Sequence, residues 1–307
     1  MRRWLAAGML LALAACQPAD PLALDRATCA DADAAVEPRV AACTRLIESG
    51  EGDDAARAEW QALRGDAYYE ADSVTPALRA YEAALRLDES NARALEGRAG
   101  ILLASGQLDA AEPLVDRLIE AGDASANALR IKGDIELQRG AYTEAIEHFD
   151  DAISADGRLA LAYAHRARAK ERLQDNGGAR ADYDAAIRFD GTLAEARAGR
   201  CWLNLREERD LAQARNDAEA AVAADSQQVD AQLCRGILQL RGGEWENARR
   251  AFEAALQVEP GNPTALFGRG VARRRSGEGA GREDMNQARD FDSHIGEAFD
   301  EWGVETF

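Results

Sequence analysis

Apolar residues recur along most of the chain at helical spacing. In several segments an alanine is followed four positions later by an aromatic residue, and three positions after that by a second alanine. Residues at i, i+4 and i+7 share one face of an α-helix, so each set predicts a helix with a buried face. The sets are Ala77, Tyr81 and Ala84; Ala145, Phe149 and Ala152; Ala179, Tyr183 and Ala186; and Ala248, Phe252 and Ala255.

These segments recur with a period of 34 or 35 residues. The segment before them often closes on glycine, which suits the left-handed conformation that ends a helix; the examples are Gly106, Gly140, Gly243 and Gly277. Each block therefore predicts helix, tight turn, helix, and the period predicts a stack of such pairs. The blocks begin at Ala58, Ala92, Ala126, Ala160, Ala194, Val229 and Pro263.

The pattern resembles the tetratricopeptide repeat (TPR) over about residues 58–288. The residues that carry the resemblance best are Gly65, Tyr68, Ala77, Tyr81 and Ala84, and the block from Val229, which ends at Pro260. The resemblance implies an all-α solenoid, a right-handed superhelix whose first helices line a concave groove. Pro113 departs from the pattern, and we expect it in or just beyond the first turn of a helix that begins near Asp109.

Further segments are predicted before and after the repeats. We expect a signal peptide at 1–15, a tether at 16–27, a helical segment at 28–57 and about seven repeats at 58–290. Residues 291–307 predict a C-terminal capping helix, with inward side chains at Phe291, Ile295, Phe299 and Trp302.

The N-terminus predicts export. Arg2 and Arg3 precede an apolar run from Trp4 to Ala15, which is shorter than the about 20 residues that span a membrane but suits a secretory signal. The run ends in Leu-Ala-Ala-Cys, which resembles a bacterial lipobox, so Cys16 is expected to be acylated as the first mature residue. Gln17 resembles the residue found in lipoproteins sorted to the periplasmic face of the outer membrane. An ordinary signal peptide, giving a soluble periplasmic protein, and a twin-arginine route are the alternatives.

Composition argues against several functions. The formal net charge is -18, the reverse of the basic footprint of nucleic-acid binders, so we expect no nucleic-acid partner. No paired cysteine or histidine spacing indicates a metal, and no phosphate loop or serine elbow occurs. We therefore expect no catalytic residue, no cofactor and no enzymatic activity. His165 is interpreted as a packed or paired histidine.

A basic residue occupies the seventh position of every block. We interpret these residues as structural, with packed stems and heads paired to acids such as Glu82, Asp150, Asp184 and Glu253 on second helices. A polyanion track is the alternative. The residues are Arg64, Arg98, Lys132, Arg166, Arg200, Arg235 and Arg269.

Arginine also occupies the thirteenth position of four successive blocks, at Arg172, Arg206, Arg241 and Arg275. Positions that border the groove in related arrays carry apolar residues nearby, among them Trp202, Leu233, Ile237, Phe267 and Val271. Together they predict a site for a peptide with apolar side chains and carboxylates. The alternative is that these arginines only stabilise their own helices, because a positive charge near a helix C-terminus interacts favourably with the helix dipole.

Four further cysteines allow two disulfides in an oxidising compartment. Exported repeat proteins that this chain resembles often carry an N-terminal cysteine pair, which implies a Cys29–Cys43 bridge. Cys201 and Cys234 lie on first helices of adjacent blocks. We expect them to be small buried residues, and whether they are bridged stays open.

The predicted function is an envelope-anchored scaffold that binds a protein, as a peptide or helix, in its groove. Lipoproteins of this architecture act as adaptors for cell-wall enzymes, secretion or pilus machinery, and outer-membrane assembly. Two alternatives stay open: a cell-wall-turnover enzyme or accessory subunit, and a chaperone-like binder of exposed apolar segments. The sequence predicts neither the partner nor the oligomeric state.

Overall fold

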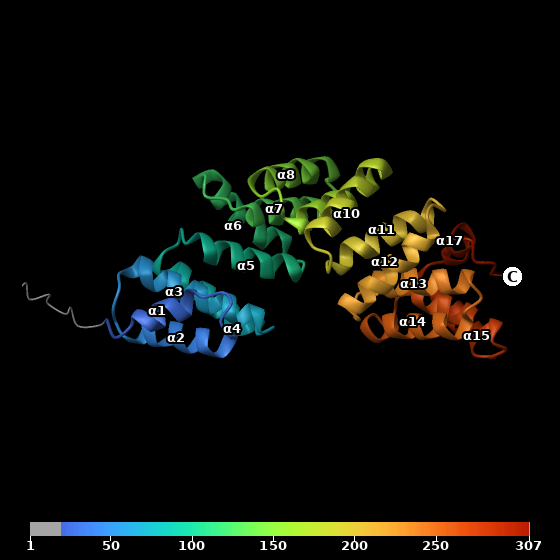
Figure 1. Ribbon diagram of the computed structural model, residues 1–307, viewed down its shortest axis with the longest axis horizontal. Helices are drawn as coiled ribbons and strands as arrows, with labels where there is room; N and C mark the ends of the chain where they lie inside the picture. Colours follow the sequence, from blue (N-terminus) through green and yellow to red (C-terminus); the bar gives the residue numbers. More distant parts are fainter. Residues whose placement is uncertain (1–19, 307) are drawn as a thin grey trace, which may run out of the picture. The chain divides into compact units, whose positions relative to one another are not determined.

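A computed structural model describes residues 20–306 of the chain (Figure 1). These residues form seventeen α-helices and no β-strand. None of these helices has the length and apolar composition needed to cross a membrane. The predicted signal peptide and Cys16 lie outside the described residues.

The helices fall into two units, which are described separately. The first unit, up to Ala104, contains α1 (Ala23–Ala30), α2 (Val36–Glu48), α3 (Asp54–Glu70), α4 (Val74–Leu87) and α5 (Ala92–Ala104). The second unit begins at Ser105 and contains α6 (Leu108–Ala121), α7 (Ala126–Arg139), α8 (Tyr142–Ala155), α9 (Ala160–Arg172), α10 (Asn176–Phe189), α11 (Ala194–Arg206), α12 (Leu211–Ala224), α13 (Val229–Arg241), α14 (Trp245–Val258), α15 (Pro263–Arg275), α16 (Gly281–Phe291) and α17 (Ile295–Glu301).

In chain order, α3 and α4 pack as a pair in the first unit, and α7 to α16 pack as five successive pairs in the second unit; α5 and α6, on either side of the boundary between the units, complete the alternation of the repeats. The odd-numbered helices are the first helices of their pairs and the even-numbered helices are the second helices. The all-helical repeat fold predicted from the sequence is thereby confirmed. Pro113 is the sixth residue of α6 and so lies just beyond the first turn, as the sequence predicted.

Each aromatic residue of the repeat packs against a glycine on a first helix. Phe252 is fully buried between Gly236 on α13 and Gly268 on α15. A Cβ atom placed on Gly268 would lie 2.3 Å from Cζ of Phe252, which is far inside contact distance. Tyr81 stands in the same relation to Gly65 and Gly97 in the first unit. Glycine is therefore required there because the ring occupies the space that a side chain would take.

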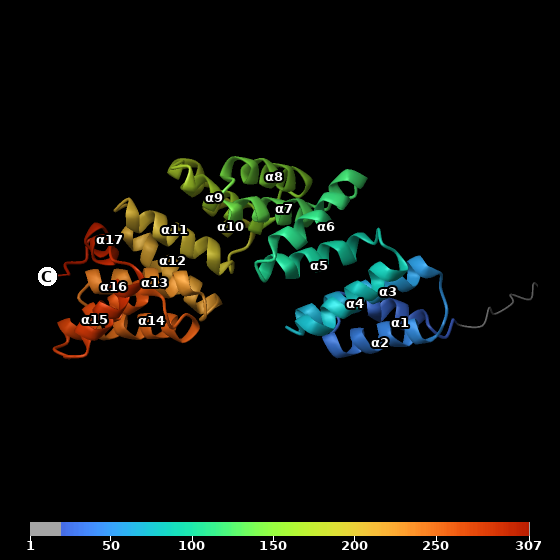
Figure 2. The ribbon, with the colours of Figure 1, turned by 180° about the vertical axis from the view of Figure 1, so that it is seen from behind.

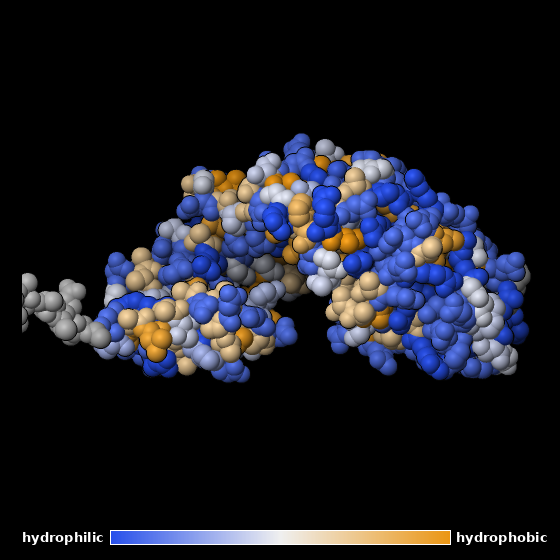
Figure 3. Space-filling model, viewed as in Figure 1, coloured by the Kyte–Doolittle hydropathy of each residue, from blue (hydrophilic) through white to orange (hydrophobic). Residues whose placement is uncertain are grey.

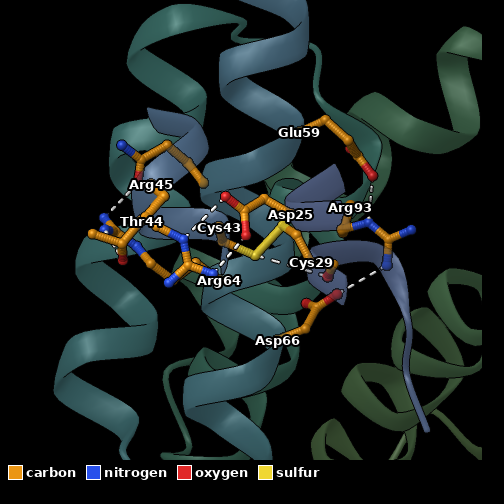
Figure 4. The surroundings of a disulfide bond; sticks show 10 residues. Asp25, Cys29, Cys43, Thr44, Arg45, Glu59, Arg64, Asp66 and Arg93 are labelled. Carbon is orange, nitrogen blue, oxygen red and sulfur yellow. Dashed lines mark hydrogen bonds and ion pairs between the residues drawn. A yellow bond between two sulfur atoms is a disulfide. The ribbon is translucent and has the colours of Figure 1, made fainter. Parts of the chain in front are cut away.

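Two disulfides cross-link neighbouring helices. Cys29 on α1 is bonded to Cys43 on α2, with their Cα atoms 4.9 Å apart (Figure 4). Cys201 on α11 is bonded to Cys234 on α13, with a Cα–Cα distance of 6.5 Å. The expectation that Cys201 and Cys234 are merely buried residues was incomplete, because the packing of successive first helices brings their Cα atoms within bridging range.

The C-terminal end differs from the expected cap in one residue. Ile295 and Phe299 are buried and Trp302 is partly buried, but Phe291 is 61% exposed. Phe291 is the last residue of α16, and the chain leaves that helix before α17 begins. The inward set therefore starts at Ile295, and the prediction for Phe291 was wrong.

Candidate protein-binding face

Four of the basic residues at the seventh position are held by acids from second helices: Lys132, Arg166, Arg200 and Arg269. Arg64 instead bonds to Thr44 and Gln61, and Arg235 to Gln232. Arg166 donates two hydrogen bonds to Asp182, at 2.9 and 2.6 Å, and also pairs with Asp150. Arg200 is bound in the same way by Asp217, with both distances 2.7 Å. Bidentate pairs of this kind fix a guanidinium in one orientation.

The structure adds partners that the sequence interpretation missed. Asp182, Asp217 and Asp284 are buried, and each directly precedes the residue at the aromatic position of its second helix. The sequence could have indicated these partners, because an acid directly before a core position of a second helix is buried and needs a cation beside it. Glu253 pairs with Arg249 and Arg273, and the partner of Arg269 is Asp284.

The arginines at the thirteenth position are also engaged. Arg206 pairs with Glu171, and Arg241 lies 3.2 Å from Glu208. Arg275 donates a 2.9 Å hydrogen bond to the carbonyl oxygen of Glu305, near the C-terminus. Arg172 is exposed at the end of α9.

The apolar residues predicted beside these arginines are covered. Leu233, Ile237 and Phe267 are at most 5% exposed and share one core cluster with Phe299 and Val304. α17 packs against α15 and α16 (Figures 1 and 2), and the residues that follow it, Trp302 and Gly303, reach α11 and α13. Residues 295–306, called here the C-terminal segment, therefore contact four of the eight residues that the sequence assigned to a partner site, namely Trp202, Arg241, Phe267 and Arg275.

Trp202 on α11 also contacts the C-terminal segment. Its indole Nε1 donates a 2.9 Å hydrogen bond to the carbonyl oxygen of Asp230. Its ring meets Trp302 edge to face, with centroids 5.2 Å apart. Trp202 is consequently held between α13 and the C-terminal segment.

A charged cluster crosses three first helices N-terminal to this covered strip. His165 on α9 contacts Asp134 on α7 through Nδ1 and Glu195 on α11 through Nε2, the latter at 3.1 Å. Arg130 pairs with Asp134 in turn. We call Arg130, Asp134, His165 and Glu195 the His165 cluster. Sequence reasoning gave His165 as packed or paired, and it could not identify partners about 30 residues away on either side.

The cluster favours a protonated histidine. Burial lowers the pKa of His165, but the charges of Asp134 and Glu195 and their hydrogen bonds outweigh it and raise the pKa to about 9. Burial raises the pKa of Glu195, but His165 and nearby arginines outweigh it and hold that pKa below its usual value. Both ring nitrogens of His165 are engaged, so the imidazole has no free lone pair with which to act as a base at neutral pH.

The arrangement suits recognition by charge and shape. Within residues 20–306, no group of three or more histidine, cysteine and carboxylate residues is placed to hold a metal ion. Among the coloured residues in Figure 3, hydrophobic side chains form small separate patches within a mostly hydrophilic surface. Arg168 and Arg172 are exposed on α9, four residues apart and so on one side of the helix.

Comparison with known proteins agrees with this architecture. A family model described as tetratricopeptide repeat matches residues 62–126, 101–160 and 235–281. The human mitochondrial import receptor subunit TOM70 is 32% identical over 120 residues, which are 38% of this chain and 20% of that protein. The chain thus spans about a fifth of the length of this relative.

Two solved structures share the fold at low sequence identity. The APC/C hetero-tetramer Cut9–Hcn1 matches with a TM-score of 0.62 and 14% identity, over 88% of this chain and 54% of that one. Pseudomonas aeruginosa pilF matches with a TM-score of 0.56 and 14% identity, over 68% of this chain and 94% of that one.

Stacked helix pairs with a conserved spacing of small and aromatic positions define a helical repeat protein. Its architecture is that of a protein–protein interaction scaffold. The chain is a tetratricopeptide repeat protein, a family whose members bind protein or peptide partners.

Proposed function

We propose that the protein is an exported, lipid-anchored scaffold of the bacterial envelope, and that it binds a partner peptide or helix along the first helices α7, α9 and α11. The observation that carries this proposal is the His165 cluster. It fixes charges across three successive first helices and leaves Arg168 and Arg172 exposed beside them. A segment lying across these helices would place carboxylates against the two arginines.

The catalytic alternative receives less support. His165 is the histidine that the first helices bring into a cluster with carboxylates, and both of its nitrogens are used to hold Asp134 and Glu195. A buried and fully paired charge network favours a rigid recognition surface over proton transfer.

The binding proposal is tested by in-cell photocrosslinking. A crosslinkable residue at Arg168 or Arg172 should capture a defined partner, while one at Ala223, an exposed position on the second helix α12, should not. With the crosslinkable residue at Arg172, the change Arg168→Glu should reduce capture, and raised salt should do the same without that change. Equal capture from Ala223, or no capture from α9, would contradict the proposal.

The anchoring proposal rests on Cys16 and on the compartment. The Leu-Ala-Ala-Cys motif ends the apolar run, and two disulfides are typical of an oxidising compartment. Gln17 favours the outer membrane, at its periplasmic face. Mass spectrometry should find a mature chain that begins at an acylated Cys16, and Cys16→Ser should release the protein from the membrane fraction. An unmodified chain that begins at another residue would end this proposal.

A further inference from the structure

The C-terminal segment runs back over three repeats. Trp302 contacts Trp202 on α11, Gly303 lies against Arg241 on α13, and Glu305 accepts from Arg275 on α15. A cap needs to cover only the last helix pair of a stack. This segment instead crosses the first helices in the manner of a bound peptide.

A sharp turn seats the segment in this position. The backbone N–H of Gly303 donates to Asp300 at 3.0 Å and that of Val304 donates to Phe299 at 2.9 Å, which closes α17 with a left-handed glycine at φ 71°. The turn directs Val304 into the core, where it is 3% exposed. Phe299 is fully buried and its ring centroid lies 4.9 Å from that of Phe267.

Two arginines hold the backbone of the segment. Arg275 donates to the carbonyl oxygen of Glu305 at 2.9 Å. The guanidinium of Arg241 packs so closely on Gly303 that a Cβ atom there would lie 2.9 Å from its Cζ. Nη1 of Arg241 is buried without a hydrogen-bond partner among the described residues. A ligand carbonyl or carboxylate could satisfy this donor.

The segment also complements the arginines in charge. Four acids lie between Ile295 and Thr306, at Glu297, Asp300, Glu301 and Glu305, and this stretch contains no lysine or arginine. Only Asp292, Ser293 and His294 link it to the end of α16. The segment can therefore leave its place through changes in three linking residues, with α16 kept intact.

We propose that Leu233, Ile237, Phe267, Arg241 and Arg275 form a peptide groove, and that the C-terminal segment is its built-in occupant. The external partner is a protein segment of the same chemistry: aromatic and aliphatic residues at helical spacing, flanked by carboxylates and without basic residues. It binds by displacing the C-terminal segment, so its apparent affinity is reduced by the fraction of chains in which the groove is closed. This inference rests on the proposed function, because both require a protein partner. Its binding site, however, is the peptide groove and not the His165 cluster.

The test uses a labelled peptide that spans residues 292–307 and the full-length chain. In Phe299→Ala with Trp302→Ala, the resident segment loses its anchors while the groove residues stay unchanged. This variant should bind the free peptide about tenfold more tightly than the native chain, because its groove is open more often. Adding Arg275→Ala to the variant should weaken binding again. Fluorescence anisotropy measures all of these affinities.

Matched controls separate displacement from general unfolding. Phe291→Ala, which changes an exposed residue before the linker, should leave the peptide affinity at the native value. A peptide with alanine at the positions of Phe299 and Trp302 should not bind the double variant. Circular dichroism and non-reducing gels verify that the variants keep their helices and disulfides. If the folded double variant binds neither better nor more selectively than the native chain, the segment is a simple cap and the inference fails. Crosslinking at Arg168 would then still decide the proposed function.

Discussion

Residues 20–48 and residues 292–306 lie at opposite ends of the described sequence, and each covers the repeats beside it. The N-terminal pair α1 and α2 is closed by the Cys29–Cys43 disulfide and by Arg45, which pairs with Asp25 across the two helices (Figure 4). The C-terminal segment is held by packing of Phe299 and Trp302 and by Arg275. A covalent closure keeps α1 and α2 together, whereas a packed closure can open and close again. One end of this scaffold is therefore closed by a covalent bond, and the other is held by contacts that can exchange.

The largest expected effect comes from removing the aromatic ring that anchors the C-terminal segment. Phe299→Ala removes a fully buried ring that lies between Phe252 and Phe267, so the second unit should lose about 3–5 kcal/mol of unfolding free energy. Urea denaturation followed by tryptophan fluorescence measures the loss. Phe291→Ala is the control and should change stability by less than about 0.5 kcal/mol. Equal losses in the two variants would show that Phe299 does not close the groove.

Removing the Cys29–Cys43 disulfide should destabilise the first unit. Replacing Cys29 and Cys43 by serine removes a loop constraint worth about 3 kcal/mol for a loop of roughly this length. Hydrogen exchange should rise in α1 and α2 and stay unchanged in α17. If α17 also exchanged faster, the two closures would not be independent.

Alkaline pH should weaken the second unit through His165, which lies there. The pKa of His165 is raised to about 9, so its stabilising effect is fully present below the unfolded pKa of about 6.5 and is lost as the pH rises through about 9. We expect a loss of roughly 3 kcal/mol between pH 6 and 10, because each pH unit between about 6.5 and 9 costs about 1.4 kcal/mol, and thermal melts measure it. His165→Gln should flatten this profile. A native profile that is already flat would contradict the raised pKa.

The smallest expected effect concerns the turn that seats the C-terminal segment. Gly303→Ala places a side chain at positive φ and against Arg241, whereas Gly277→Ala meets positive φ with open space around it. Both should cost about 1 kcal/mol of backbone strain, and Gly303→Ala should cost more because Arg241 must move. Hydrogen exchange of residues 295–306 should rise in Gly303→Ala alone. If both variants showed the same hydrogen exchange, the contact of Arg241 with Gly303 would not help to hold the C-terminal segment.

The predicted groove residues show where sequence reasoning stops. Leu233, Ile237 and Phe267 were placed correctly on first helices, because helical periodicity fixes which face a residue occupies. Their cover could not be predicted, since the contacts of Trp302 with Trp202 and of Gly303 with Arg241 join residues 60 to 100 positions apart in the sequence. No local propensity encodes which distant segment fills an apolar strip.

The sequence by itself determined the helix pairs, their period and the positions of the two arginine series, because these depend on spacing along the chain. It also supplied the motif at Cys16, which lies outside the described residues. Only the tertiary structure decided which charges meet, that Cys201 reaches Cys234, and that the C-terminal segment covers its own groove. Those outcomes depend on how successive helices stack, and stacking places side chains from different repeats within contact distance in ways that one repeat cannot reveal.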